Sequence, residues 1–387
     1  MTDSFIDRVR ERLAADAGPI RPAAVAAAIR AESGGVLGDT EVLRNIRVLE
    51  TELTGAGILE PLLIDADTCD ILVTAPEQVW VDDGNGLRRS DIRFEDEAAV
   101  RRLAQRLAIA AGRRLDDAQP WVDGHLSDLG SGNFGVRLHA VLPPVAAGGT
   151  CLSLRVLRPA VQDLAGLTAS GAIAPEARRL LDGIISTRLA FLVSGGTGAG
   201  KTTLLAAMLG AVGERERIIC VEDAPELSPR HPHLVRLVAR PANVEGAGEI
   251  TLRDLVRQAL RMRPDRLVVG EVRGAEVVDL LCALNTGHSG GAGTLHANSP
   301  ADVPSRLEAL GALGGLDRAA LHSQLAAAVQ AVVHLSRTSG HRRVEEIAVL
   351  RRGPTGLVEA LTAWHAEHGT GDGAPVLRRL LDSDPRS

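Results

Sequence analysis

The segment from Leu192 to Thr203 restricts the fold and the ligands of this chain more than any other feature. Its letters, LVSGGTGAGKTT, fit the spacing G-x-x-x-x-G-K-[ST], and the defining positions are Gly195, Gly200, Lys201 and Thr202. Apolar residues 190–194 before it predict a strand, and residues 203–209 predict a helix. A glycine-rich turn between them lets backbone N–H groups and the positive helix end surround a phosphate. A chance glycine-rich turn is the alternative, but the flanks favour a P-loop that binds a nucleoside triphosphate.

Two side chains of this loop have separate expected tasks. Lys201 is expected to reach the β- and γ-phosphates, and the Thr202 hydroxyl to ligate Mg²⁺. The expected nucleotide contacts are Gly195, Gly196, Thr197, Gly198, Ala199, Gly200, Lys201, Thr202 and Thr203.

Length and composition restrict the class of protein. A chain of 387 residues is long enough for two or three domains. Its net charge of −6 and aromatic content of 2% argue against stable nucleic-acid binding. The N-terminus lacks a signal-peptide pattern, and no apolar run reaches 18 residues, so we expect a cytoplasmic protein without a membrane span. It is expected to associate peripherally with a membrane complex.

Hydrophobic patterns divide the chain into five segments. Strand and helix patterns are mixed at 61–160, which suggests an α+β domain on an antiparallel sheet. Apolar strands alternate with helices after residue 190, which is typical of a parallel sheet covered on both faces. The predicted segments are helices at 1–60, the α+β domain at 61–160, a linker at 161–173, the nucleotide-binding domain at 174–366 and a flexible tail at 367–387.

Acidic residues end two apolar strands of the predicted nucleotide-binding domain. The run 217–221 leads into Glu222 and Asp223, and 266–270 leads into Glu271. Such carboxylates can hold Mg²⁺ or position water beside a P-loop, because strand ends meet at the ligand crevice. The alternatives are a salt bridge for Glu271 and capping or solvation for Glu222, Asp223 and the nearby Glu226.

Two histidines flank a glycine-rich stretch after the second acidic strand. His288 and His296 enclose the segment Ser289–Gly293. The residues alone leave open whether these histidines sense the nucleotide or are structural.

Taken together, these motifs resemble the secretion ATPases of the tight-adherence (Flp) pilus branch. That branch belongs to the superfamily of type II and type IV secretion traffic ATPases. The resemblance rests on the P-loop, on NVEGAGEITLRDLVRQALRMRPDR at 243–266, on GEVRGAE at 270–276 and on NTGH at 285–288. It extends from about Gly57 to Ile347.

The resemblance implies a fold, an assembly and an activity. The α/β fold would be a RecA-like domain with a mostly parallel sheet, behind a PAS-like α+β domain and a short helical N-terminal segment. The assembly would be a homo-hexamer that works with polytopic inner-membrane platform proteins. The activity would be hydrolysis of ATP with Mg²⁺.

The resemblance also implies roles for individual residues. Glu222 corresponds to the water-activating base, and Glu271 to the acidic residue on the Mg²⁺ side. His288 and His296 correspond to the histidine box. Arg137 and Arg155 correspond to N-terminal-domain arginines that reach the γ-phosphate, where positive charge stabilises phosphoryl transfer.

One segment departs from the family pattern. The family usually has an acidic residue and bulkier residues between its two histidines, whereas this chain has SGGAG at 289–293. We expect the additional glycines to loosen this segment.

Three functions fit these observations. The first is a hexameric ATPase motor that drives pilus assembly or secretion across the cell envelope. The second is a catalytically weak nucleotide-binding scaffold of the same machine. The third is a motor for nucleic-acid transfer, which the acidic composition disfavours.

Overall fold

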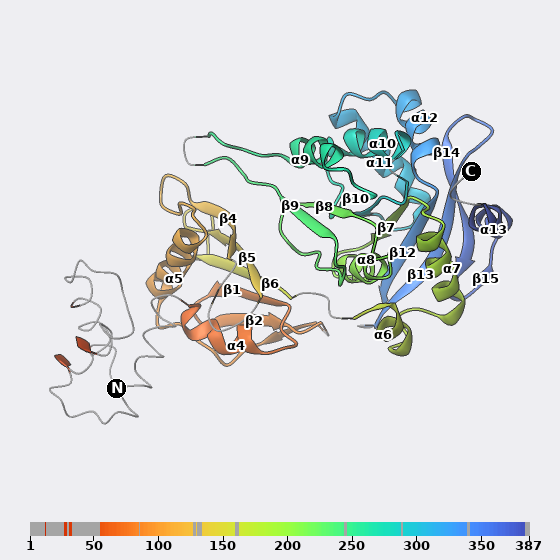
Figure 1. Ribbon diagram of the computed structural model, residues 1–387. Helices are drawn as coiled ribbons and strands as arrows, with labels where there is room; N and C mark the ends of the chain where they lie inside the picture. Colours follow the sequence, from red (N-terminus) through yellow and green to blue (C-terminus); the bar gives the residue numbers. More distant parts are fainter. Residues whose placement is uncertain are drawn as a thin grey trace. The chain divides into compact units, whose positions relative to one another are not determined.

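The chain forms two compact units, Met1–Leu157 and Arg158–Ser387, each described here by itself. This computed structural model describes residues 12, 27–28, 31–32, 55–84, 86–126, 129, 134–158, 162–243, 246–287, 289–338 and 341–383. Most of the predicted helical segment 1–60 lies outside these residues. Figure 1 shows the elements along the chain.

The first unit is built on a six-stranded antiparallel sheet in the order β3-β2-β1-β6-β5-β4. Alternation directs Val136, Leu138 and Ala140 of β5 into the core, while Arg137 and His139 face the other side. The strands are β1 Asp70–Ala75, β2 Gln78–Asp82, β3 Leu87–Arg89, β4 Trp121–Leu126, β5 Gly135–Val141 and β6 Cys151–Leu157.

Helices cover one face of this sheet. The helix α5 begins after Asp96, whose carboxylate accepts a hydrogen bond from the Ala99 N–H at 2.7 Å. Its buried residues Val100, Leu103 and Leu107 follow helical spacing and join the core of the unit. The helical elements are η1 Gly57–Leu59, α4 Glu60–Ile64 and α5 Glu97–Ala110.

The second unit contains a nine-stranded sheet in the order β15-β14-β13-β12-β7-β11-β10-β8-β9. The six strands from β9 to β12 in this order are parallel, and β13, β14 and β15 extend the sheet in antiparallel fashion. The strands are β7 Phe191–Gly195, β8 Ile218–Glu222, β9 Leu234–Val238, β10 Arg266–Val269, β11 Ala292–Leu295, β12 Ala331–Thr338, β13 His341–Arg352, β14 Val358–His365 and β15 Gly369–Thr370.

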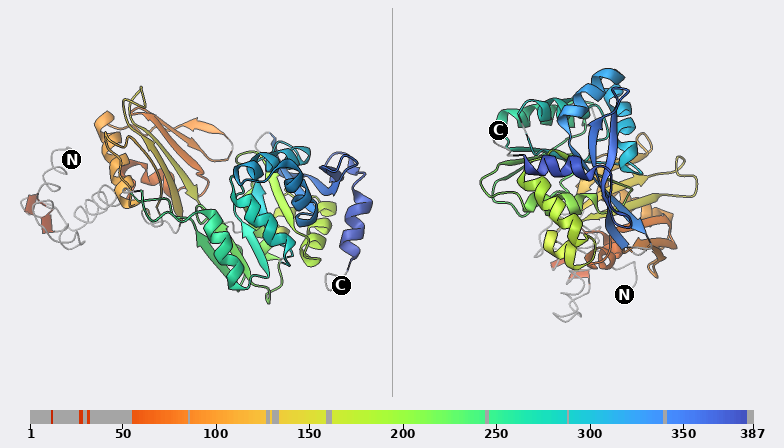
Figure 2. Two further views of the ribbon diagram at one scale, coloured as in Figure 1. Left: turned by 90° about the horizontal axis from the view of Figure 1, so that it is seen from above. Right: turned by 90° about the vertical axis from the view of Figure 1, so that its right-hand side faces the viewer.

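Helices pack on both faces of the larger sheet (Figure 2). The side chains of successive strand residues point to opposite faces of the sheet. Phe191 and Val193 of β7 therefore belong to one hydrophobic core, and Leu192 belongs to the other. Helices α6, α7, α8 and α13 contribute to the first core, and α9 to α12 to the second. The helical elements are α6 Leu164–Ala169, α7 Pro175–Ser186, α8 Lys201–Gly210, α9 Leu252–Ala259, η2 Leu260–Met262, α10 Glu276–Asn285, η3 Pro300–Asp302, α11 Val303–Leu313, α12 Arg318–Ala328 and α13 Ala374–Asp382.

This architecture confirms the predicted α/β fold class, with an α+β unit ahead of a mostly parallel sheet. Within the part of the chain that the structure describes, no helix is both long and apolar enough to cross a membrane.

Two segments differ from the prediction. The predicted linker 161–173 contains α6, whose Leu164 and Leu167 are buried. The predicted flexible tail 367–387 contains β15 and α13. Leu377 of α13 is only 1% exposed, and a Cβ built on Gly183 of α7 would lie 3.0 Å from the Leu381 side chain. Apolar residues at helical spacing therefore dock this segment, despite the glycines that precede it.

The docking of α13 can be tested with Leu377→Ala. Loss of a buried leucine side chain leaves a cavity, so the free energy of unfolding should fall by about 2–4 kcal/mol. The measurement is urea unfolding of the full chain, with the exposed Arg378→Ala as the matched control. Equal stability of the two variants would show that α13 does not pack on the unit.

Candidate functional site

The predicted P-loop connects the end of β7 to the start of α8. Gly195 has φ +152° and lies against β12, where an added Cβ would be 2.5 Å from the Leu335 carbonyl oxygen. Gly198 and Gly200 have φ values of +71° and +94°, in the left-handed region that favours glycine. The loop therefore needs glycine at three positions to pass between its strand and helix.

Lys201 is the first residue of α8 and is only 8% exposed. Its Nζ donates hydrogen bonds to the carbonyl oxygens of Gly195 at 3.0 Å and Gly196 at 2.8 Å. Burial lowers the pKa of this ammonium from its ordinary value. Two carbonyl groups thus hold the positive charge at the loop. Thr202 and Thr203 follow Lys201 in the first turn of α8.

Glu222 ends β8 as a buried carboxyl group that is 3% exposed. Its Oε1 accepts hydrogen bonds from the N–H groups of Leu227 at 2.7 Å and Glu226 at 3.1 Å. Its Oε2 is buried and has no hydrogen-bond partner among the described residues. Burial raises the pKa of Glu222 to about 7. One oxygen of this carboxyl is therefore fixed by two N–H groups, and the other is buried without a hydrogen-bond partner among the described residues.

The space for Glu222 depends on the neighbouring strand β10. A Cβ on Gly270, directly after β10, would lie 2.8 Å from the Glu222 Cγ. The next acidic residue in sequence, Asp223, forms an ion pair with Arg273 at 2.7 Å. The two carboxyl groups therefore have different partners in the structure, although the residues are adjacent in the sequence.

Glu271 and His296 come from neighbouring strand ends and contact each other. The His296 Nε2 lies 2.8 Å from the Glu271 Oε1, and its Nδ1 lies 3.4 Å from the Lys201 Nζ. Burial, and then the Lys201 charge, lower the pKa of His296. The structure therefore brings together Lys201, Glu271 and His296, three of the residues that the sequence selected.

The oxygen donors at this site suit a magnesium ion. Thr202 supplies a hydroxyl and Glu271 a carboxylate, and Mg²⁺ typically takes one or two such protein oxygens together with substrate phosphates. Among the described residues, no group of three His, Cys, Asp or Glu side chains could hold a metal by itself. The donor set fits an ion that depends on the nucleotide for its remaining ligands.

The glycine-rich segment between the histidines has a packing role. His288 lies outside the described residues, so its predicted role stays a prediction. A Cβ on Gly290 would lie 2.8 Å from the Arg266 Nη1, and one on Gly293 would lie 3.1 Å from the Val269 carbonyl oxygen. The expectation that these glycines loosen the segment is not what the structure shows, because both allow close contact with the second unit's core.

Sequence reasoning missed residues that support the site from distant segments. The Oγ of Ser194 lies 2.9 Å from the Nδ1 of His334, a buried residue of β12. Arg266 is 1% exposed and bonds Glu216 at 2.8 Å and the Gly290 carbonyl at 3.3 Å. The available signal was an arginine at the start of an apolar strand. Its burial could not be predicted, because its partners are far away in the sequence.

A cavity of about 520 Å³ opens beside the P-loop. Its walls combine the loop with the segment after β11 and with α11. The lining residues are Gly195, Gly196, Thr197, His296, Ala297, Asn298, Asp302, Ser305, Arg306 and Ala309.

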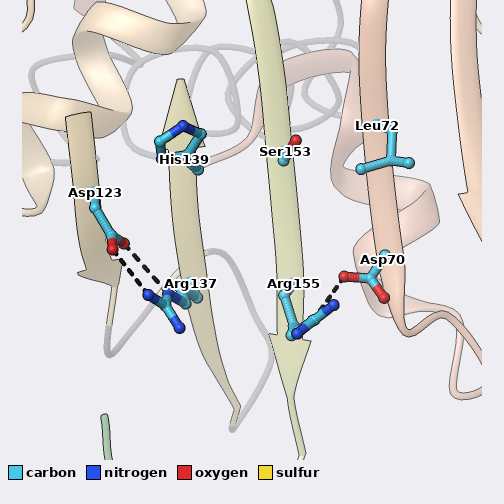
Figure 3. A pocket seen from close by; sticks show the side chains of 7 residues that line it. All are labelled: Asp70, Leu72, Asp123, Arg137, His139, Ser153 and Arg155. Carbon is cyan, nitrogen blue, oxygen red and sulfur yellow. Dashed lines mark hydrogen bonds and ion pairs between the residues drawn. The ribbon is translucent and has the colours of Figure 1, made fainter. Parts of the chain in front are cut away.

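The two predicted arginines of the first unit occupy adjacent strands. Arg137 of β5 and Arg155 of β6 are directly opposite each other in the sheet register. Asp123 accepts two hydrogen bonds from Arg137, at 2.8 and 3.2 Å, and Asp70 accepts one from Arg155 at 2.8 Å (Figure 3). They line a cavity of about 300 Å³ on the sheet face opposite the core. Their approach to a γ-phosphate stays a prediction.

Comparison with known families gives one match that covers most of the chain. The family described as type II/IV secretion system protein matches residues 52–373. This match confirms the resemblance found in the sequence motifs.

Individual relatives agree with that match. A Mycobacterium tuberculosis (strain H37Rv) protein named after conjugal transfer is 74% identical over 349 residues, covering 90% of this chain and 99% of that protein. The type IV secretion system protein PtlH of Bordetella pertussis is 33% identical over 267 residues, covering 62% of this chain and 76% of PtlH.

Solved structures share the fold. The Legionella pneumophila ATPase DotB has a TM-score of 0.52 at 19% identity, covering 85% of this chain and 83% of DotB. The pilus retraction motor PilT with bound ADP has a TM-score of 0.52 at 23% identity, covering 75% of this chain and 80% of PilT.

The burial of Glu222 predicts a pH-dependent stability that Glu222→Gln should remove. Because the folded pKa of about 7 exceeds the ordinary 4.5, the unfolded carboxyl ionises first as pH rises. The wild-type free energy of unfolding should therefore fall relative to the variant between about pH 4.5 and 7. Above pH 7 the accumulated change should be about 3 kcal/mol.

Urea unfolding of the nucleotide-free chain at several pH values measures this difference. Glu214→Gln, at an exposed position near β8, is the matched control and should follow the wild type. A constant difference between wild type and Glu222→Gln across this range would contradict the raised pKa.

Proposed function

We propose that this chain, which belongs to the type II/IV secretion system protein family, is a Mg²⁺-dependent ATPase motor that assembles as a homo-hexamer. Its work would be the assembly of a pilus of the tight-adherence type, or secretion of a substrate across the cell envelope. It would act at the cytoplasmic face of the membrane with polytopic platform proteins.

One observation carries the hydrolytic part of this proposal. Glu222 is a buried carboxyl group with a pKa of about 7; two N–H groups anchor one of its oxygens, and the other has no hydrogen-bond partner in the part of the chain that the structure describes. A general base works best when its pKa is close to the operating pH. It stands at the carboxyl edge of the parallel sheet that also carries the P-loop, where ligands bind in such folds.

The remaining residues divide the work of phosphoryl transfer. Lys201 and the loop N–H groups hold the β- and γ-phosphates, and Glu222 takes a proton from the attacking water. Arg137 and Arg155 supply positive charge to the phosphoryl oxygens as the transition state forms. Thr202 and Glu271 would hold Mg²⁺, which would supply positive charge to the phosphates when bound.

A weak nucleotide-binding scaffold is the alternative within the same machine. The glycine segment that motivated it is well packed at Gly290 and Gly293, and Lys201 and Glu222 are both in place. These observations favour the motor.

The relatives provide a reason to keep a second candidate function. A Mycobacterium tuberculosis relative and Sinorhizobium fredii TrbB, 31% identical over 265 residues, both carry names that refer to conjugal transfer. A motor of that kind could be stimulated by DNA, whereas the net charge of −6 disfavours direct contact. Turnover that rises on addition of single-stranded DNA would favour this candidate.

Steady-state phosphate release by the full-length chain tests the proposal. We expect Mg²⁺-dependent turnover of ATP in the wild type and none above background in Lys201→Ala, because the β/γ-phosphate contact is lost. Turnover equal in the two proteins, or absent from both, would contradict an ATPase that works through this loop.

A second variant in the same assay separates binding from hydrolysis. Arg137→Ala/Arg155→Ala should retain nucleotide binding but lose about 10³-fold in kcat, the usual effect of removing an arginine from the transferring phosphoryl group. Arg89→Ala, on β3 of the same sheet, is the control and should hydrolyse ATP normally.

A further inference from the structure

The cavity beside the P-loop reaches the helix α11, which has no role in the site expected from the sequence. The loop residues that line this cavity are Gly195, Gly196 and Thr197, at the start of the loop. His296 also lines it, and the ring of His296 lies 3.4 Å from the Lys201 Nζ. The cavity therefore begins where the loop leaves β7, and it lies close to the lysine of the loop.

One side of α11 forms another wall of this cavity. Four lining residues of this segment are three or four positions apart, so they share one side of the helix. Val303 and Leu307 lie on another side and are buried in the second core of the unit. The packing of α11 thus fixes which side chains face the loop. The four lining residues are Asp302, Ser305, Arg306 and Ala309.

Arg306 supplies the positive charge of this wall. Its side chain is exposed, and among the residues that the structure describes it makes no hydrogen bond or ion pair. Glu308, two positions later and so on the opposite side of the helix, pairs with Arg318 at 3.2 Å. Asp302, one turn earlier, accepts a hydrogen bond from the Ser299 hydroxyl at 2.9 Å. The nearest acidic residues along the helix therefore have other partners.

The charge of Arg306 acts on the residues at the loop. Burial lowers the pKa of His296 most, and the charges of Lys201 and Arg306 act in the same direction, against that of Glu271. Two permanent cations, one from the loop and one from α11, are thus close to the same ring. An anion in the cavity would be attracted to both of them.

The P-loop determines which part of a nucleotide would enter this cavity. The N–H groups of such a loop surround the α- and β-phosphates, and its lysine reaches the β- and γ-phosphates. The γ-phosphate is therefore expected near Lys201 and the neighbouring His296. The cavity lies at these residues, and its volume of about 520 Å³ has room for a phosphoryl group together with water.

We propose that Arg306 of α11 binds the γ-phosphate of ATP in the same chain as the P-loop. This inference rests on the proposed function. A guanidinium group binds phosphate oxygens through strong charge-assisted hydrogen bonds. Because ADP has no γ-phosphate, Arg306 would let the site distinguish ATP from ADP.

This role is distinct from that proposed for Arg137 and Arg155. Those two arginines belong to the first unit, whereas Arg306 belongs to the unit that contains the P-loop. Its contact with the nucleotide therefore requires no particular placement of the first unit. Arg306 would already bind the γ-phosphate in the ground state, so its loss should raise the KM for ATP.

Calorimetric titration of the full-length chain with Mg²⁺ and either ADP or a non-hydrolysable ATP analogue tests the inference. Arg306→Met should bind the analogue about 10-fold more weakly than the wild type, because one charge-assisted hydrogen bond is lost, and should bind ADP with wild-type affinity. Methionine keeps an apolar stem of similar length. Arg318→Met, which removes a guanidinium group from the other side of α11, is the matched control and should bind both nucleotides normally.

Two further measurements separate binding from packing. Arg306→Lys keeps the positive charge, and partial recovery of the affinity for the analogue would support the inference. The thermal midpoint of nucleotide-free Arg306→Met should equal that of the wild type.

Three results would overturn the inference. Wild-type affinity of Arg306→Met for the analogue would do so and leave the ATPase proposal standing. An equal loss of affinity for ADP and for the analogue, with a lowered thermal midpoint, would assign Arg306 a structural role instead. A wild type that binds neither nucleotide would overturn the inference and the proposed function together.

Discussion

The central constraint on this structure is the burial of two ionisable groups at one edge of the larger sheet. Lys201 and Glu222 are 8% and 3% exposed, and among the residues that the structure describes neither has a counter-ion at hydrogen-bond distance. Burial of an isolated charge costs several kcal/mol unless polar groups solvate it. Loop carbonyls solvate the ammonium, and N–H groups of the turn after β8 solvate one carboxyl oxygen. The same burial lowers the pKa of the Lys201 ammonium and raises the pKa of the Glu222 carboxyl to about 7, which lies in the range suited to a general base.

That constraint explains why glycine or a particular contact is found at several positions that take no part in the proposed reaction. Gly270 must lack a side chain because the Glu222 Cγ occupies the space beside it. Gly195 must lack one because β12 passes close to the loop. The Ser194–His334 contact joins the same two strands just before the loop begins. The P-loop is thus held from the side of β12 as well as by its own strand and helix.

The sequence predicted the parts of the site that lie within one short segment. The P-loop and the acidic strand ends were evident, because apolar strands and turn residues adjoin them in the chain. The family resemblance selected Glu222 rather than Asp223 as the base, but the physical difference between them was not visible, because only the fold of the following turn directs two N–H groups to Glu222. His334 was missed, because strand pairing across more than a hundred residues brings it to the loop. The docked helix α13 was missed because glycines before it suggested a flexible tail.

The dependence of kcat on pH tests the central claim most directly. If Glu222 accepts the proton of the attacking water, wild-type kcat should rise with pH toward a plateau, with a midpoint near its pKa of about 7. Glu222→Gln should lower kcat by about 10²- to 10⁴-fold at the plateau and abolish this rise, while nucleotide binding remains. A Glu222→Gln variant that keeps the wild-type kcat and pH profile would contradict the account.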